Sequence, residues 1–385
     1  GNTLAFVATI VGLGALFGAI LEHSGGARSI ADSLLRRFGM DRAPLAMVIA
    51  GFVVAIPVFL DVAFIILVPV IYALQRKSGK SLLRFAIPLL AGLAVTHAFV
   101  PPTPGPIAAA DILGANLGWV ILAGFIAGLP SALVAGLWFG GYISKRMMIE
   151  APPEASEEEP TDLPNATLIF SIIALPIVLI VANTIVNTIP STSEHAKSIM
   201  GFIGHPFVAL IIANLMAWYI LGIRRGHTKE TLATISLKSL GPAGMIILLT
   251  GAGGVLKQVL IDTGVGTMIA ESMEGFTSLP IIFAFVIAAL VRALQGSATV
   301  AMITAAGLVA PMIQNTTQGG LDLALIVCAI ASGASMLSHV NDSGFWLVNR
   351  YLGLTERQTF RSWTVMTTLA GFIGFIITFA ISLFI

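Results

Sequence analysis

The sequence predicts an all-α polytopic membrane protein with two inverted repeats, each containing a re-entrant helical hairpin and a broken transmembrane helix. Composition is the first observation: of the 385 residues, 57% are hydrophobic and 10% are charged, whereas soluble domains carry about 25% charged residues. The second is a pair of breaks, proline-rich at 97–106 and polar at 338–344, inside long apolar segments. The third is that one order of segments occurs twice.

Charge and cysteine usage exclude several classes of protein. The net charge is +1, so the chain lacks the basic surface that nucleic-acid binding requires. The single cysteine, Cys328, excludes a disulfide framework, and the six histidines show no metal-ligand spacing. We therefore expect no nucleic-acid partner, no bound metal and no cofactor.

The first repeat is expected at residues 1–149. It begins with a span at Leu4–Leu21, and an amphipathic piece follows at Ala27–Phe38. Such a piece is typical of a short helix that lies in the membrane interface. After the hairpin described next, a broken helix at 85–113 and a span at 117–143 complete the repeat.

The hairpin of the first repeat is expected at residues 44–74. This segment is apolar except for Asp61 and exceeds the ~20 residues that cross a bilayer. Pro57 interrupts it near the middle, where a proline would break a regular helix. A re-entrant hairpin with its tip at 57–61 explains both observations, and one long tilted helix is the alternative.

The middle of the chain separates the repeats. Residues 150–165 are rich in Glu, Pro and Ser, which predicts an acidic, solvated linker in the cytoplasm. Residues 166–239 supply two further spans, at Ala166–Ile189 and Phe202–Ile223, which we assign to a scaffold. The second repeat, 240–385, then contains a span, an interfacial piece, a hairpin, a broken helix and a final span, at Leu240–Ile261, Val265–Phe276, 280–313, 321–351 and Phe360–Ile385.

Two observations predict that the repeats are inverted. Residues 21–25 and 29–33 are similar to 260–264 and 268–272, and five crossings separate the first span from its counterpart. An odd number of crossings reverses the orientation. On this topology one face carries 17 of the 20 basic residues and is cytoplasmic by the positive-inside rule: Arg28, Arg36, Arg37, Arg42, Arg76, Lys77, Lys80, Arg84, Lys145, Arg146, Arg224, Arg225, Lys229, Lys238, Arg350, Arg357 and Arg361.

This plan predicts a secondary transporter rather than an enzyme. Transporters place substrate and ions where discontinuous helices meet near the bilayer midplane. A channel is the alternative within membrane transport, although a pore does not need two opposed hairpins. The chain shows no nucleophile elbow, no paired catalytic aspartates and no metal-ligand spacing, which argues against an intramembrane enzyme.

Four ionisable residues are candidates for proton coupling: Asp61, Asp342, His97 and His339. An ionisable group within the membrane is a functional candidate by default because its burial is costly. Asp61 stands at the expected hairpin tip, and each histidine precedes a break. The alternative for the aspartate is helix capping or an ion pair, and for the histidines a hydrogen bond that holds the broken helix.

Polar residues at the breaks and at the second hairpin tip are candidates for substrate binding. Accessible N–H groups at helix N-termini favour anions, and the hydroxyls favour a hydroxyl-rich substrate. Arg292, four residues before the second tip, is a candidate for binding a carboxylate; snorkelling towards the interface or locking the hairpin is its alternative role. The full set is Thr103, Gly105, Gly296, Ser297, Thr299, Asn341, Ser343 and Arg292.

Four segments carry a resemblance to a known family. PVFLDVAFIILVP (57–69), HAFVPPTPGP (97–106), QGSATVAM (295–302) and SHVNDSGFW (338–346) resemble the signature segments of the GntP family of gluconate permeases. The match extends over nearly the whole chain. The family pattern begins with about two further spans, so we expect either a piece of a longer protein or a short variant.

The resemblance implies proton symport of gluconate or a closely related sugar acid across a bacterial inner membrane. The family also includes carriers for D-serine and other small hydroxy acids, which is the alternative for the substrate. Sodium is the alternative coupling ion. In plan the family is similar to the ion transporter superfamily, whose members work as elevators and usually as homodimers. A small anion, the lipid bilayer and a second copy of the chain are thus the implied partners.

Overall fold

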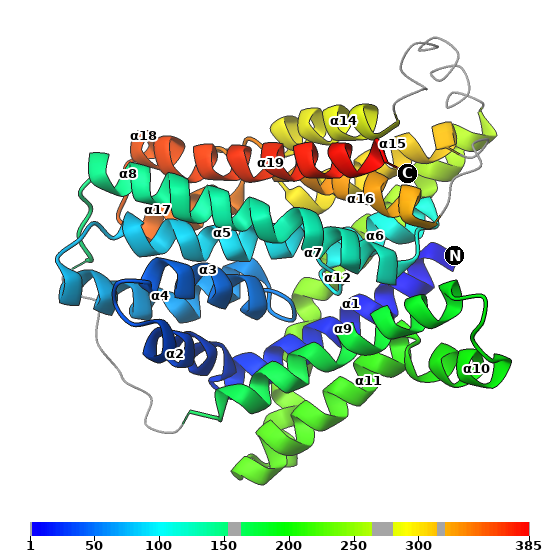
Figure 1. Ribbon diagram of the computed structural model, residues 1–385, viewed down its shortest axis with the longest axis horizontal. Coiled ribbons are helices and arrows are strands. Elements are labelled where there is room, and N and C mark those ends of the chain that lie inside the picture. The colour runs from blue at the N-terminus through cyan, green and yellow to red at the C-terminus, as the bar shows by residue number, and fades with distance from the viewer. Residues whose placement is uncertain (1, 153–162, 264–279, 314–319, 385) are drawn as a thin grey trace.

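The computed structural model describes residues 2–152, 163–263, 280–313 and 320–384, and every regular element in these residues is a helix (Figure 1). Seven of the described helices are long and apolar enough to cross a membrane. The all-α polytopic class expected from the sequence is therefore confirmed. The predicted interfacial piece Val265–Phe276 and most of the predicted linker 150–165 lie outside the described residues.

The first half contains two interrupted segments. The chain leaves helical geometry at 55–59, which excludes one long helix, and again at 100–103. In both interruptions prolines remove N–H donors. The helices are α1 (Asn2–His23), α2 (Gly26–Phe38), α3 (Ala43–Val54), α4 (Leu60–Ser78), α5 (Leu83–Phe99), α6 (Pro104–Leu113), α7 (Leu117–Leu133), the π-helix η1 (Val134–Phe139) and α8 (Gly140–Arg146).

The second half repeats this order with different interruptions. Gly296, with φ of +84°, separates α14 from α15, and residues 336–342 separate α16 from α17. The helices are α12 (Lys229–Asp262), α14 (Pro280–Gln295), α15 (Ala298–Ile313), α16 (Gly320–Ser335), α17 (Ser343–Tyr351), α18 (Glu356–Thr359), the π-helix η4 (Phe360–Thr364) and α19 (Val365–Ser382).

Two differences from the expected elements concern the middle of the chain. The helices there are α9 (Ala166–Thr188), α10 (Glu194–Ile203), α11 (Pro206–Ala217), η2 (Trp218–Gly222) and η3 (Ile223–Arg225). The sequence did not suggest α10, which begins with Ser193 as its N-cap and has no buried residue. In addition, α12 begins at Lys229 rather than at Leu240, because the polar residues before Leu240 continue the helix.

Glycines set the packing of the interrupted segments. A Cβ atom at Gly51 would lie 2.4 Å from the carbonyl oxygen of Leu89, and one at Gly92 would lie 2.3 Å from that of Val48, so α3 and α5 approach backbone to backbone. In the second half, α14 packs on α16 in the same way through Gly333. Small residues allow such close contact between membrane helices. The equivalent pairing in both halves agrees with an internal repeat.

The ends of the helices separate into two sides (Figure 1). Labels α2, α4, α8, α17 and α18 lie on the left of the view, and both termini with α10 lie on the right. Two hydrogen bonds connect α4 and α2 to the prolines on either side of residues 153–162. Arg76 Nη2 of α4 donates to the Pro152 carbonyl at 3.2 Å, and the Ser29 hydroxyl of α2 donates to the Pro164 carbonyl at 2.5 Å. This is the side that the charge distribution predicts to be cytoplasmic.

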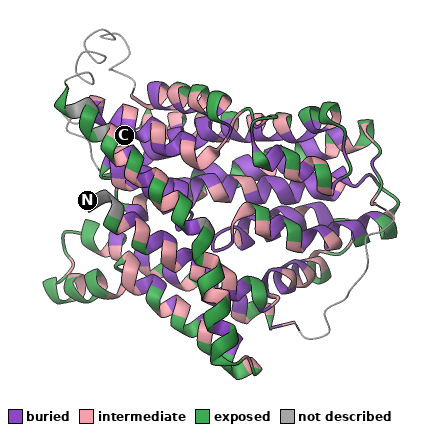
Figure 2. Cartoon of the chain, turned by 180° about the vertical axis from the view of Figure 1, so that it is seen from behind, coloured by how far each residue is buried: buried purple, intermediate pink, exposed green. Residues whose placement is uncertain are grey.

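Burial distinguishes the interrupted helices α5 and α6 from the continuous helix α12. Within Leu83–Leu113, which covers α5 and α6, 83% of an apolar 18-residue stretch is buried. The corresponding share within Lys229–Leu256 of α12 is 12%. Figure 2 shows the buried residues as a band through the middle of the bundle. The interrupted helices thus form the interior, where unpaired backbone groups are shielded from lipid.

Candidate substrate-binding site

Three of the four interruptions, at 55–59, 296–297 and 336–342, converge on one cavity of about 320 Å³. The tip between α3 and α4, the C-terminal end of α5, the tip between α14 and α15, and the start of α17 all contribute to its lining. Seven residues that the sequence singled out line this cavity: Asp61, His97, Arg292, Ser297, Thr299, Asp342 and Ser343. They are far apart in the chain, and the two halves of the fold bring them together.

Arg292 is the only cation in the cavity lining that the structure describes, and its hydrogen-bond donors are only partly used. The residue lies in the last turn of α14, where the helix dipole favours a cation. It is 4% exposed, and Nη2 donates to Asp342 Oδ2 at 2.6 Å. Nε and Nη1 are buried and make no hydrogen bond with any described residue. Since a guanidinium carries five N–H groups, donors remain for a second carboxylate.

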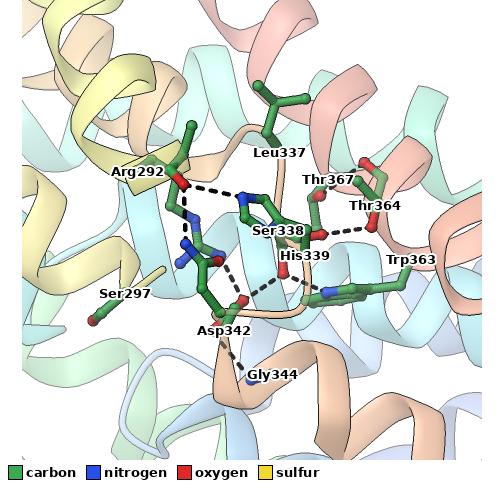
Figure 3. Close-up of polar contacts among 12 residues, drawn as sticks. Arg292, Ser297, Leu337, Ser338, His339, Asp342, Gly344, Trp363, Thr364 and Thr367 are labelled. Carbon is green, nitrogen blue, oxygen red and sulfur yellow. Dashed lines mark hydrogen bonds and ion pairs between the residues drawn. The ribbon is translucent and has the colours of Figure 1, made fainter. Parts of the chain in front are cut away.

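Asp342 is the centre of a hydrogen-bond network (Figure 3). As the N-cap of α17, its Oδ1 accepts from the backbone N–H of Gly344 at 3.1 Å. Its Oδ2 accepts from Arg292 and from the hydroxyl of Ser338. Trp363 Nε1 donates to Ser338 Oγ at 2.6 Å, so the network extends into η4. Such a fully bonded carboxylate is held in one orientation.

Asp61 and His97 face the cavity from the first half. Asp61 is in the first turn of α4, and its carboxylate makes no hydrogen bond or ion pair with the described residues. His97, in the last turn of α5, has a buried Nδ1 without a hydrogen-bond partner among them. Its ring meets that of Phe59 edge to face, with 6.4 Å between the centroids. The Asp61 carboxylate and the Nδ1 atom of His97 thus have no partner among the described residues.

His339 and Asn341 do not line the cavity. His339 Nε2 lies 3.0 Å from the carbonyl oxygen of Ala293, and Asn341 Nδ2 donates to the same oxygen at 2.9 Å. The break of the second half is thereby fastened to the end of α14. Gly296 belongs to this contact too, because a Cβ atom there would lie 2.2 Å from the Asn341 carbonyl oxygen.

Thr103 and Gly105 also lie outside the cavity. The Thr103 hydroxyl donates to the Val100 carbonyl at 2.6 Å, and the residue lines a separate space of about 10 Å³. At Gly105 a Cβ atom would lie 2.7 Å from Met302 Sδ, so the glycine allows α6 to pack on α15. In this structure both residues shape the break.

Other residues of the site carry little sequence signal. Trp363, Thr367 and Ile246 line the cavity, but no charged residue, break or repeated motif in the sequence marks them as binding residues. Phe59 adjoins Asp61 in the first signature segment, which could have indicated it. Nothing in the local pattern marks Trp363, because its partner Ser338 lies 25 residues away.

The comparison with family models decides the relationship. A model described as GntP family permease matches residues 1–384. The chain belongs to the GntP permease family. It is 42% identical over 380 residues to the low-affinity gluconate transporter of Escherichia coli K12, covering 98% of this chain and 85% of the relative. It is 41% identical over 389 residues to the Gnt-II system L-idonate transporter of the same strain, covering 99% and 87%.

A solved structure extends the comparison to the fold. The YdaH transporter of Alcanivorax borkumensis, described as having an unusual topology, superposes on this GntP permease with a TM-score of 0.66. The match covers 100% of this chain and 87% of that one at 16% sequence identity, so it concerns the fold alone. With its family and its seven candidate spans, this permease is a multi-pass protein of the bacterial inner membrane and not an enzyme.

Proposed function

We propose that this permease carries gluconate or a closely related sugar acid into the cell in symport with protons. The observation that carries the proposal is the buried guanidinium of Arg292, which belongs to the cavity lining and whose Nε and Nη1 have no hydrogen-bond partner among the described residues. Charge-assisted hydrogen bonds from the N–H groups that Asp342 leaves unused suit a carboxylate. The similarity to gluconate and L-idonate transporters supports the same class of substrate.

The rest of the lining suits the remainder of a sugar acid. The carboxylate binds Arg292, and the hydroxyls bind Ser297, Thr299 and Ser343. The N-terminus of α15 begins at Ala298 in the same lining, and helix N-termini attract anions. A cavity of about 320 Å³ has the size of small-ligand sites.

Proton coupling follows from the charges in the cavity. Arg292 and Asp342 neutralise one another, and Asp61 adds an uncompensated negative charge. A bound sugar acid would bring a second negative charge, and like charges in a site of low dielectric constant repel strongly. Protonation of Asp61 removes this repulsion, so the proton and the anion bind together. Asp342 and His97 are further proton carriers in the proposal, and His339 acts from outside the lining.

We further propose that the permease works as a homodimeric elevator. The interrupted helices form the moving unit, and α1 with α9 to α12 forms the scaffold. The likeness to a solved transporter fold and the low burial of α12 support this division. A cysteine pair between α4 and α12 should crosslink in one state and stop transport; normal uptake after verified crosslinking would refute the movement.

Uptake into proteoliposomes tests the function directly. Labelled gluconate is offered with and without an inward proton gradient, in the absence of sodium, with L-idonate and D-serine as unlabelled competitors. Accumulation that requires the gradient and is reduced by L-idonate, but not by D-serine, is the expected result. Competition by D-serine alone would assign the permease to small hydroxy-acid carriers. Accumulation driven by sodium instead of protons would refute proton coupling.

A further inference from the structure

A second cavity lies next to the substrate site. It has a volume of about 710 Å³ and lies between α1, the α3–α4 tip and the N-terminal half of α12. Phe59 and Val62 line both cavities, so the two spaces meet at these side chains. The volume falls in the range of ~300 to 1,000 Å³ in which drug-sized ligands are bound, so a sugar acid fits within it.

One helix, α12, forms a continuous wall from this cavity to the substrate site. Thr231, Ile235 and Ser239 of α12 line the second cavity, and Ile246 of the same helix lines the first. Residues seven apart lie on nearly the same side of an α-helix, so one side of α12 faces both spaces. On α1, the residues that line the second cavity also share one side: Ala15, Gly18, Ala19, Glu22 and His23.

The far end of the second cavity is polar. Glu22, His23, Glu230 and Lys238 are exposed and line it, and the ring of His23 lies 4.9 Å from that of His227. Ionisable groups at membrane depth face protein or water-filled cavities rather than lipid. This end joins the last turn of α1 to the first turns of α12, on the side predicted to be cytoplasmic. The second cavity therefore ends in exposed, charged groups on that side.

Phe59 occupies the junction. It is the N-cap residue of α4, is partly buried, and touches the substrate site through its contact with His97. The tip that carries it is close to α1, because a Cβ atom at Gly18 would lie 2.2 Å from the Pro57 carbonyl oxygen. With its backbone held there, the side chain of Phe59 sets the width of the junction.

We propose that the second cavity is the cytoplasmic passage of the permease and that the Phe59 side chain is its gate. The identity of the solute rests on the proposed function, whereas the passage itself rests on geometry. A larger side chain at position 59 should then slow the passage of small solutes between the two cavities, and a smaller side chain should speed it.

Cysteine modification measures this movement without any substrate. The only native cysteine, Cys328, is buried and is replaced by alanine. Ser297→Cys then places a single thiol in the substrate cavity. Inside-out membrane vesicles are treated with the anionic, membrane-impermeant reagent 2-sulfonatoethyl methanethiosulfonate, and the rate of modification is followed. We expect Phe59→Trp to slow this rate at least fivefold and Phe59→Ala to raise it at least twofold.

Three comparisons decide the outcome. Phe372→Trp, on the exposed side of α19 and away from both cavities, should leave the rate within twofold. Val62→Phe narrows the same junction and serves where Phe59→Trp does not fold. Right-side-out vesicles should react at least tenfold more slowly. The proposed passage would be refuted if Phe59→Trp and Val62→Phe both left the modification rate unchanged. It would also be refuted if inside-out and right-side-out vesicles reacted at equal rates.

A thiol inside the passage completes the test. Thr234→Cys lines the second cavity, whereas Leu237→Cys lies on the outer side of the same helix and serves as its control. Sulfonate attached at 234 should reduce gluconate uptake more than twofold, and that at 237 should not. If gluconate is not transported at all but the modification rates behave as expected, the proposed substrate fails and the passage stands.

Discussion

Replacing Arg292 by lysine tests the proposed carboxylate contact, because lysine keeps the charge but not the fork. The ammonium can still bind Asp342, which the guanidinium reaches at 2.6 Å. It then cannot offer two parallel hydrogen bonds to a substrate carboxylate, so we expect the net loss of one bond. A hydrogen bond to a charged group contributes about 1.5–3 kcal/mol, and each 1.4 kcal/mol is about a tenfold change in affinity. The Kd for gluconate should therefore rise about 10- to 150-fold.

The measurement is equilibrium binding of labelled gluconate to the purified protein in detergent. Arg357→Lys, an exposed arginine in α18 outside the cavity, is the matched control and should bind as the wild type does. Thermal melting of each variant shows whether the fold is retained. A Kd for Arg292→Lys within threefold of the wild type, with an unchanged melting temperature, would refute the proposed contact.

Three further variants address the coupling group, the second tip and the network. Asp61→Asn should abolish accumulation driven by the proton gradient while gluconate exchange across the membrane continues; normal accumulation would remove Asp61 from the mechanism. Gly296→Ala and Gly353→Ala each place a side chain at positive φ, which costs about 1–2 kcal/mol, but only the first also meets the Asn341 carbonyl oxygen. The melting temperature should therefore fall further in Gly296→Ala than in Gly353→Ala. Equal falls in the two variants would mean that the contact with the Asn341 carbonyl does not matter for stability. Trp363→Phe keeps an aromatic ring but removes the indole N–H that donates to the Ser338 hydroxyl. That bond contributes about 1 kcal/mol, so the Kd for gluconate should rise about fivefold. An unchanged Kd would mean that Trp363 does not position Asp342.

Much of the fold could be predicted because its signals are local. Pro57 and the proline-rich run from Pro101 mark interruptions by the donors that they remove. Asp61 and Arg292 stand out because charged residues within apolar segments are rare. The repeat then indicates that these interruptions face one another, and the structure places both residues in one cavity.

The remaining features depend on tertiary contacts. Asn341 and Ser343 are two residues apart in an irregular break, where no periodicity shows which side chain points inward; the structure turns Asn341 to the Ala293 carbonyl and Ser343 to the cavity. A tryptophan in an apolar helix is usually a packing residue. The role of Trp363 in the site follows only from its hydrogen bond to Ser338, which the sequence does not show. The length of α12 was missed because its polar first turns, beginning at Lys229, carry no hydrophobic signal.

The continuity of α12 has a practical consequence for measuring transport. Its 34 residues correspond to about 51 Å at ~1.5 Å per residue, which exceeds a hydrocarbon core of ~30 Å. Because one side of this helix faces both cavities, cysteines at 231, 235, 239 and 246 form a molecular ruler beside the α3–α4 tip. Each turn is ~5.4 Å, so the turn that crosslinks to residue 58 would report, in steps of that size, how far the tip lies along α12 in each state of the proposed elevator.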